Sequence, residues 1–477
     1  MWRFLRVALL CAGTTSAAAA DAPWVALTLG DLKAVHDTLR ENHPAPVDTS
    51  PDAAPYKRWL EDGLLQAKAR AVGAHSFEEY QRVIQFYVNG FRDGHISTSA
   101  NVDTTVETWP GFVLGGTSAD DAVVVSARED AGVKAGDRLI SCDDRTVDAL
   151  LKERTDPYYW NADIPHARFA QLYRLFYESL SDPQPKLEHC MFASGPVNLS
   201  WRTIRMMELQ PILQTARGRG ARELRIQKIG DVWLISIPTF SYLTHDDTEK
   251  ARAFAAALSA HALDFENATI VIDVRGNGGG DSGWGKSFAA ALWGKDWVDR
   301  IERQFDDTVD WRVTKKNIAA LETTVAHKHA EQEDSFTYWN GILTGMKAAM
   351  AQGKVYYREE SPAQPVTGPA PADALHGHIY LFTDAGCASA CLDFADLMTR
   401  LPGVTQIGLP TYADALYIDN NTVLLPSGLT SLNYGMKVYR HRARGNNKWY
   451  EPKVRWPGGP VTDEAIARWA ATLAQTR

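Results

Sequence analysis

Two apolar runs in the second half of the chain each end in a loop of small residues that leads into a helical pattern. ATIVIDV (residues 268–274) runs into RGNGGGDSGWGKSF, and HIYLFT (residues 378–383) runs into DAGCASACLDFADLM. A strand–turn–helix corner presents a side chain while backbone N–H groups and a helix N-terminus point at the same place. One such corner can hold a nucleophile, and the other can bind the negative charge that its attack creates.

The alternation of strands and helices begins near residue 225. VWLISIPTF and the two runs above read as strands, and DTEKARAFAAALSAH reads as a helix, which favours a largely parallel sheet. Residues 300–360 are polar and helical, and SPAQPVTGPAPADALHG is a Pro-rich connector too poor in apolar residues to pack. We therefore predict an α/β fold (α+β multidomain) whose core, residues 201–477, carries a helical insertion at about 300–375.

The N-terminal part differs in pattern from this core. Residues 21–105 predict a helical domain, in which Ser76 and Glu79 form a capping box and the last helix stops at Asp93-Gly94. His95 follows at once and is therefore expected on a chain reversal. Residues 106–200 read as short strands, a helix and a connector, and TVLLPSGLTSLNYGMKVYR predicts a β-hairpin near the end of the chain.

Composition and the N-terminus limit the function classes. The net charge of -8 over 477 residues argues against a general nucleic-acid binder. MWRFLRVALLCAGTTSAAAADAPW predicts a cleavable signal peptide, residues 1–20, with the mature chain starting at about Asp21. We therefore expect a periplasmic or secreted protein without a stable membrane span. Cleavage leaves four cysteines, and two of them, Cys387 and Cys391, flank Ser389; they either form a local disulfide or are small buried residues at a tight corner.

Ser389 is the candidate nucleophile. A serine hydroxyl needs a base to take its proton and donors to stabilise the oxyanion that its attack creates. The N–H of Ala390 and those of Gly278 and Gly279 are the candidate oxyanion donors, because the glycines permit close backbone approach. Two other interpretations are a serine N-cap and a dinucleotide-binding loop, although the third glycine of that fingerprint would fall on an aspartate.

Several segments in one order resemble the S41 serine peptidases, the tail-specific and tricorn-core family. IVIDVRGNGGG resembles its strand-and-glycine signature, HIYLFTDAGCASACLDFADLM its nucleophile segment and GVTQIGLPT the strand that follows. FRDGHIS resembles its Asp-Gly-His motif, WYEPKVRWP its Glu-Pro closing motif, and AGVKAGDRLISCDDRTVDAL its PDZ module. The resemblance implies a ClpP/crotonase-like β-α core and a PDZ-like module within 106–200, which either binds a peptide terminus or is a spacer.

The resemblance also implies which groups would activate the serine. The position of the tail-specific lysine holds Asp414 here, which disfavours a Ser–Lys dyad. His95 matches the histidine of the tricorn-like branch, and an unperturbed imidazole suits a general base at neutral pH. Glu451 is the carboxylate expected to orient it, although Asn446 occupies the place nearest to the family's glutamate. The usual glutamate three places after the serine is Leu392, a further departure.

Other histidines are weaker candidates. His43 precedes a proline at a helix end, which is typical of a turn, and His327 and His329 lie on a polar helix without carboxylates at ligand spacing. We therefore expect no metal and no organic cofactor.

The sequence thus predicts an exported serine endopeptidase that acts on peptides or proteins through an acyl-enzyme on Ser389, with His95 as general base. The alternatives are a catalytically weak or inactive scaffold of the same fold that binds peptides or proteins, and an esterase or other acyl transferase.

Overall fold

The computed structural model describes residues 18–102, 106–118, 120–159, 161, 163–178, 185–217, 223–328, 333–371, 375–459 and 461–476. Of the predicted signal peptide, residues 1–17 lie outside this description, and Ala18 begins the first helix, α1 (Ala18–Asn42). No helix in the described ranges combines the length and apolar content that a bilayer crossing requires.

A six-stranded sheet forms the core of the C-terminal half. Its order is β10 (Arg225–Ile229), β11 (Val232–Ser236), β12 (Thr269–Asp273), β15 (His378–Thr383), β16 (Val404–Gly408) and β19 (Val454–Arg455). The strands from β11 to β19 are parallel, and β10 pairs antiparallel at the edge. The predicted α/β class and the largely parallel sheet are confirmed.

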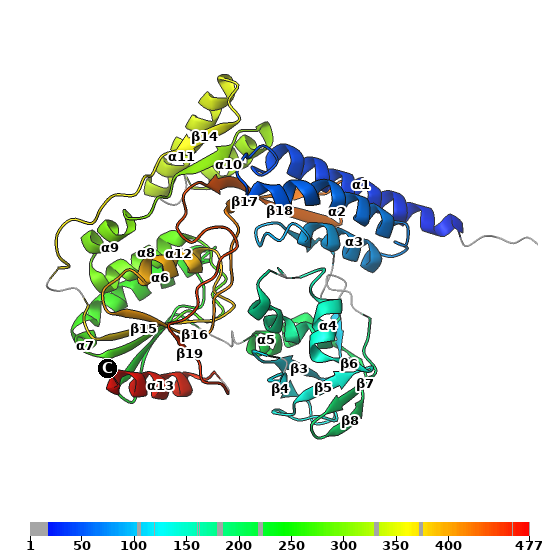
Figure 1. The fold of residues 1–477 in the computed structure, drawn as a ribbon, viewed down its shortest axis with the longest axis horizontal. Helices are drawn as coiled ribbons and strands as arrows, with labels where there is room; N and C mark the ends of the chain where they lie inside the picture. The colour runs from blue at the N-terminus through cyan, green and yellow to red at the C-terminus, as the bar shows by residue number, and fades with distance from the viewer. Residues whose placement is uncertain are drawn as a thin grey trace, which may run out of the picture.

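Helices cover both faces of this sheet (Figure 1). α6 (His245–Ala260), α8 (Ser282–Trp293) and α12 (Ala390–Met398) lie on one face, and α13 (Asp463–Gln475) lies on the other. The strands are apolar on both sides for this reason: Ile272 and Leu381 pack under the three helices, whereas Val271 and Tyr380 pack against α13. The carboxyl ends of β12 and β15 then lead directly into the two predicted corners.

A second sheet joins the N-terminal part of the chain to its C-terminal half. It contains β1 (Ser97–Ala100), β13 (Val309–Arg312), β14 (Tyr356–Glu359), β17 (Tyr417–Leu424) and β18 (Thr430–Tyr439). β17 and β18 form the predicted hairpin, and β1 pairs antiparallel with β18, Ser97 opposite Asn433. This pairing carries the segment that follows His95 into the C-terminal half of the chain.

The helices around the second sheet share one hydrophobic core with it. They are α1, α2 (Ala53–Ala71), α3 (Phe77–Asn89), α10 (Lys315–Lys328) and α11 (Glu333–Ala351). Ser76 caps α3 as predicted, its Oγ accepting a hydrogen bond from the Glu79 N–H at 3.2 Å. The N-terminal helices and the helical insertion, which are far apart in the sequence, therefore pack together rather than as separate units (Figure 1).

Residues 106–217 form a smaller β-rich unit with its own core. Two strand pairs and a four-stranded sheet, β6-β5-β7-β8, are packed against helices. A disulfide between Cys142 and Cys190 joins β5 to β7. The elements are β2 (Val106–Trp109), β3 (Phe112–Gly115), β4 (Val123–Ala127), β5 (Leu139–Cys142), β6 (Arg145–Thr146), α4 (Val147–Arg154), η1 (Pro165–Phe176), β7 (His189–Phe192), β8 (Gly195–Asn198), β9 (Arg202–Arg205) and α5 (Met206–Ala216).

Candidate active site

Ser389 lies at the turn between β15 and α12, immediately before the first residue of the helix. Its backbone is left-handed, with φ 55° and ψ −126°, a conformation that costs a non-glycine residue free energy. Ser389 occupies the N-cap position of α12, but its side chain makes no capping hydrogen bond to the helix. The hydroxyl is therefore not engaged by its own helix.

The hydroxyl of Ser389 contacts His95. The distance from His95 Nε2 to Ser389 Oγ is 3.3 Å, although the two residues are 294 positions apart in the sequence. His95 is 8% exposed and follows the turn that ends α3, and the β1–β18 pairing holds this turn against the C-terminal half. An imidazole nitrogen at this distance can accept the serine proton, provided that the ring carries its own hydrogen on Nδ1.

Asp93 lies behind the imidazole. Its Oδ1 accepts the backbone N–H of His95 at 2.8 Å and stands 3.7 Å from His95 Nδ1. Burial raises the pKa of Asp93 to about 6; the neighbouring charge of His95 opposes the rise, and Asp414 adds to it. Asp93 was not singled out from the sequence as a functional residue, although its place in FRDGHIS, two residues before His95, was the available signal.

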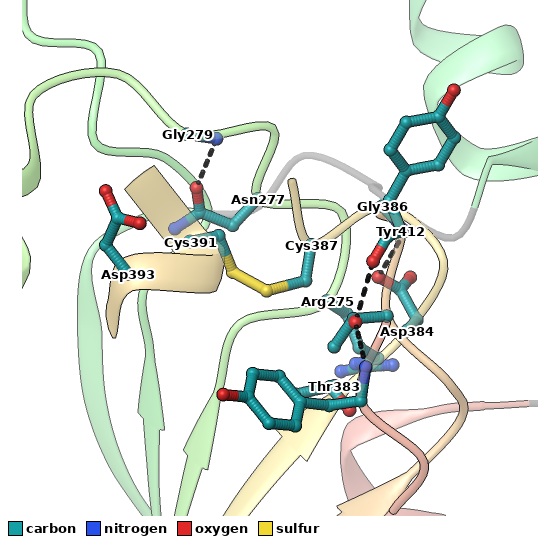
Figure 2. The surroundings of a disulfide bond; sticks show 12 residues. Arg275, Asn277, Gly279, Thr383, Asp384, Gly386, Cys387, Cys391, Asp393 and Tyr412 are labelled. Carbon is teal, nitrogen blue, oxygen red and sulfur yellow. Dashed lines mark hydrogen bonds between the residues drawn. A yellow bond between two sulfur atoms is a disulfide. The ribbon is translucent and has the colours of Figure 1, made fainter. Parts of the chain in front are cut away.

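The two predicted corners are joined to each other by a shared carboxylate. Asp384 Oδ1 accepts the N–H of Gly276 at 2.8 Å and that of Gly386 at 2.9 Å. The backbones approach so closely that a Cβ on Gly386 would lie 2.5 Å from Gly276 Cα. Figure 2 shows Asp384 between these loops. The glycine loop and the nucleophile turn are therefore held as one unit, and Asp384 is a second residue that the sequence analysis did not single out.

The candidate oxyanion donors are not equivalent. The Gly279 N–H donates to Asn277 Oδ1 at 2.9 Å (Figure 2), so this donor is already engaged. Gly278 is exposed, and its N–H has no acceptor within the described part of the chain. Ala390 is the first residue of α12, where a backbone N–H lacks an intrahelical acceptor. Of the predicted glycine donors, Gly278 is the one that remains available.

Gly279 has a steric role instead. Its φ is +94°, and a Cβ there would lie 2.7 Å from Ser389 Cβ. Only glycine permits the loop to approach the nucleophile turn this closely.

A disulfide joins Cys387 and Cys391 across the nucleophile turn, with Cα atoms 5.2 Å apart. Figure 2 shows the bond between the loop and the first turn of α12. The local pairing that the sequence left open is present, and it closes the loop that contains Ser389.

Glu451 lies elsewhere. Its side chain is half exposed, its Oε1 accepts from Trp449 Nε1 at 2.9 Å, and its Oε2 pairs with Arg455 at 2.5 Å. Within the described residues it makes no contact with His95, so the expected orienting role of Glu451 is not supported by the geometry. The side chain of Glu451 is held next to Trp449 by these two contacts, with Trp449 and with Arg455.

The structure also shows the surroundings of the other residues that depart from the family pattern. Asn446 Oδ1 accepts the Leu416 N–H at 3.1 Å, so Asn446 does not hold the His95 ring. Asp414, at the position of the lysine, is buried close enough to Asp93 to act on its pKa. Leu392 lies on α12 and is fully buried.

The remaining histidines give no metal site in the described ranges, where no group of three potential ligands gathers. His327 Nδ1 lies 2.8 Å from the Thr323 carbonyl oxygen on its own helix, and His329 lies outside the described residues.

Comparison with known proteins identifies the core. Residues 231–446 match the model of peptidase family S41. The structure of mature CPAF complexed with lactacystin is similar, at 14% identity and a TM-score of 0.65, over 95% of this chain and 98% of that one. A serine-to-alanine mutant of CPAF gives 14% identity and a TM-score of 0.64, over 95% and 96%. No curated protein sequence matches the chain.

At this identity the two structures establish similarity of fold alone. The family match, however, includes the glycine loop and the Ser389 turn. Fold and site together define a serine-type peptidase. Residues 231–446 thus match peptidase family S41, the family that the sequence motifs resemble.

Proposed function

We propose that the protein is an exported serine endopeptidase whose nucleophile is Ser389 and whose general base is His95. The contact of 3.3 Å between His95 Nε2 and the hydroxyl of a serine with left-handed backbone is the observation that carries the proposal. Residues in sparsely populated backbone regions cluster at functional sites. Asp93 takes the orienting role that the sequence assigned to Glu451.

In the first half of the reaction, Ser389 Oγ attacks the peptide carbonyl carbon while its proton passes to His95 Nε2. The negative charge that develops on the carbonyl oxygen is stabilised by the N–H groups of Ala390 and Gly278. The carbon–nitrogen bond then breaks, and the proton moves from His95 to the leaving amine. The product is an acyl-enzyme ester on Ser389.

In the second half, His95 takes a proton from water, and the resulting hydroxide attacks the ester carbonyl. The ester bond breaks, and the proton returns from His95 to Ser389 Oγ. Ionised Asp93 stabilises the imidazolium in both halves, because it places negative charge 3.7 Å from Nδ1.

Export to the periplasm or secretion is part of the proposal. Two disulfides, Cys142–Cys190 and Cys387–Cys391, support it, because such bonds persist in oxidising compartments. The signal-like N-terminal sequence gives independent support. For the β-rich unit at 106–217, the expected PDZ-like binding of a peptide terminus remains a proposal.

The decisive experiment compares wild type with Ser389→Ala and His95→Ala in peptide hydrolysis and in labelling by a fluorophosphonate. We expect the wild type to be labelled stoichiometrically at Ser389 and both variants to lose labelling and turnover. Undiminished turnover in either variant would end the assignment. A folded wild type that neither hydrolyses peptides nor reacts with the label would favour the non-catalytic scaffold. The observation that favours this alternative is that Asp93 makes no direct hydrogen bond to His95 Nδ1.

A further inference from the structure

His43 lies next to Asp93, near carboxylate oxygen Oδ2, whereas His95 Nδ1 lies near Oδ1. It follows the end of α1, and its side chain is fully buried against the rings of Tyr56 and Tyr417, whose centroids lie 4.5 Å and 4.7 Å away. The Nε2 atom of His43 is 3.8 Å from Asp93 Oδ2. The sequence favoured a simple turn at this His-Pro pair, and the turn is present, but the imidazole points into the site.

The tautomer of His43 is set by its neighbour. Its Nδ1 accepts the backbone N–H of Ala45 at 3.2 Å. A nitrogen that accepts an amide hydrogen carries a lone pair, so the single hydrogen of the neutral ring is on Nε2. Burial, with a smaller contribution from the charge of His95, lowers the pKa of His43 to about 3, so the ring is neutral at physiological pH. His43 therefore presents an N–H donor to Asp93.

Three buried polar atoms form a row between these residues. His43 Nε2, Asp93 Oδ2 and His95 Nδ1 each lack a hydrogen-bond partner among the described residues. His43 Nε2 is 3.8 Å from Asp93 Oδ2, and His95 Nδ1 is 3.7 Å from Oδ1 of the same carboxylate. A water that bridges two polar atoms holds them roughly 4.5 Å apart, so neither distance leaves room for a bridging water. Each pair can therefore be joined only by a direct hydrogen bond. A shift of about 0.9 Å brings each pair to hydrogen-bond length.

Such a shift is expected when substrate binds. Catalytic hydrogen bonds are often long in the free enzyme and tighten in the complex. Leaving buried donors and acceptors unpaired is costly, which drives the row to contract.

We propose that His43 is a positioning residue of this peptidase: its Nε2–H binds Asp93 Oδ2 and thereby holds Oδ1 toward the Nδ1–H of His95. The inference rests on the proposed function of Ser389 and His95. In this arrangement His43 keeps Asp93 ionised and fixed, so that His95 has its lone pair on Nε2, facing the serine.

The pH dependence of this row is shared with other groups. The groups that act on Asp93, or on which Asp93 acts, come from several elements: Tyr56, His95, Tyr412, Asp414 and Tyr417. His43 lies 3.8 Å from its carboxylate. The tyrosines have raised pKa values through burial and are neutral at the pH of the assay. Loss of the His43 donor leaves the carboxylate with less stabilisation and raises the pKa of Asp93.

The test uses the full chain with two substitutions of opposite design. His43→Phe keeps the stacked ring and removes the donor, whereas His43→Gln removes the ring and keeps an N–H near the Nε2 position. We expect His43→Phe to lower kcat about 10- to 100-fold, the effect of losing one hydrogen bond to a charged group, with KM nearly unchanged. The acidic limb of its kcat/KM profile moves to higher pH. His43→Gln recovers most of kcat.

His36→Phe is the matched control, because His36 is a buried histidine on α1 that contacts other carboxylates, Asp37 and Glu61. We expect wild-type kcat and an unmoved acidic limb for this variant. A folded His43→Phe with wild-type kcat and acidic limb would overturn the inference, as would a His43→Gln no better than His43→Phe.

If His43→Phe does not fold, the inference can still be tested on the wild type by a spectrum of its histidine rings, which requires no turnover. In wild type labelled with ¹⁵N-histidine, the His43 ring should show the Nε2–H tautomer and should not titrate between about pH 5 and 8. A titrating His43, or a hydrogen on its Nδ1, would refute the inference. Absence of fluorophosphonate labelling in wild type would instead refute the proposed function, while the spectrum still reports on His43.

Discussion

A single methyl group at Gly279 would test the geometry of the nucleophile turn directly. A Cβ there would lie 2.7 Å from the Ala388 carbonyl oxygen, 2.7 Å from Ser389 Cβ and 2.8 Å from the Ala390 nitrogen. Ordinary contact begins at 3.4 Å, so the nucleophile must move by about 0.7 Å (3.4 − 2.7). No flexible side chain can absorb this movement, because the contacted atoms are backbone atoms or the Cβ of Ser389.

We expect Gly279→Ala to lower kcat on the order of 10²-fold, since a displacement approaching 1 Å at the reacting centre has that effect. The assay is steady-state hydrolysis of a fluorogenic peptide, with fluorophosphonate labelling as a second readout. Alanine at φ +94° also costs roughly 1–2 kcal/mol of stability.

Gly294→Ala is the matched control for this backbone cost. Gly294 has φ +82° in the same domain, and nothing lies within 4 Å of the Cβ position. We expect a similar loss of stability with wild-type kcat. If Gly279→Ala retained kcat within about twofold of wild type, or if both variants lost activity equally, the steric argument for this loop would be wrong.

Three further predictions concern the groups around the nucleophile. Asp93→Asn should lower kcat by about 10²–10⁴-fold because the imidazolium loses its counter-charge and its tautomer, whereas Glu451→Gln should stay within about twofold; the reverse ranking in steady-state kinetics would restore the original assignment. Burial raises the pKa of Asp93 from 3.8 to about 6, so activity should rise with pH through about 6. The stability that protonated Asp93 contributes is full below about pH 4 and is lost as the pH rises through about 6. A Tm difference between wild type and Asp93→Asn that does not change with pH would contradict this. Reduction of Cys387–Cys391, or alanine at both positions, should destabilise the turn by roughly 2 kcal/mol and lower kcat, and a reduced enzyme with unchanged Tm and kcat would show that the bond is dispensable.

Much of the architecture was predictable from local pattern. Strands buried on both faces read as continuous apolar runs, so ATIVIDV and HIYLFT identified the parallel sheet and the position of the Ser389 turn. Ser76 and Glu79 likewise identified the start of α3, because a capping box acts within a single turn. These signals depend only on neighbouring residues, and the structure has the predicted elements at the predicted positions.

The orienting carboxylate illustrates what pattern could not supply. Glu451 was chosen because it was the carboxylate nearest in sequence to the expected position, yet Arg455 and Trp449 hold it at the surface. Asp93 faces His95 because both belong to one tight turn after α3. Which of two carboxylates reaches an imidazole depends on distances of a few ångströms, and sequence spacing does not report these between distant segments.

The sequence by itself determined the class of the fold, the corner that presents Ser389 and the match of residues 231–446 to a peptidase family, because each depends on contiguous residues. Only the tertiary structure decided that the N-terminal helices share a core with the insertion and the C-terminal hairpin, and that β1 pairs with β18. These long-range contacts bring His95, Asp93 and His43 to the serine. They arise from the burial of apolar surface that many segments contribute jointly, and no single segment encodes the partner against which it packs.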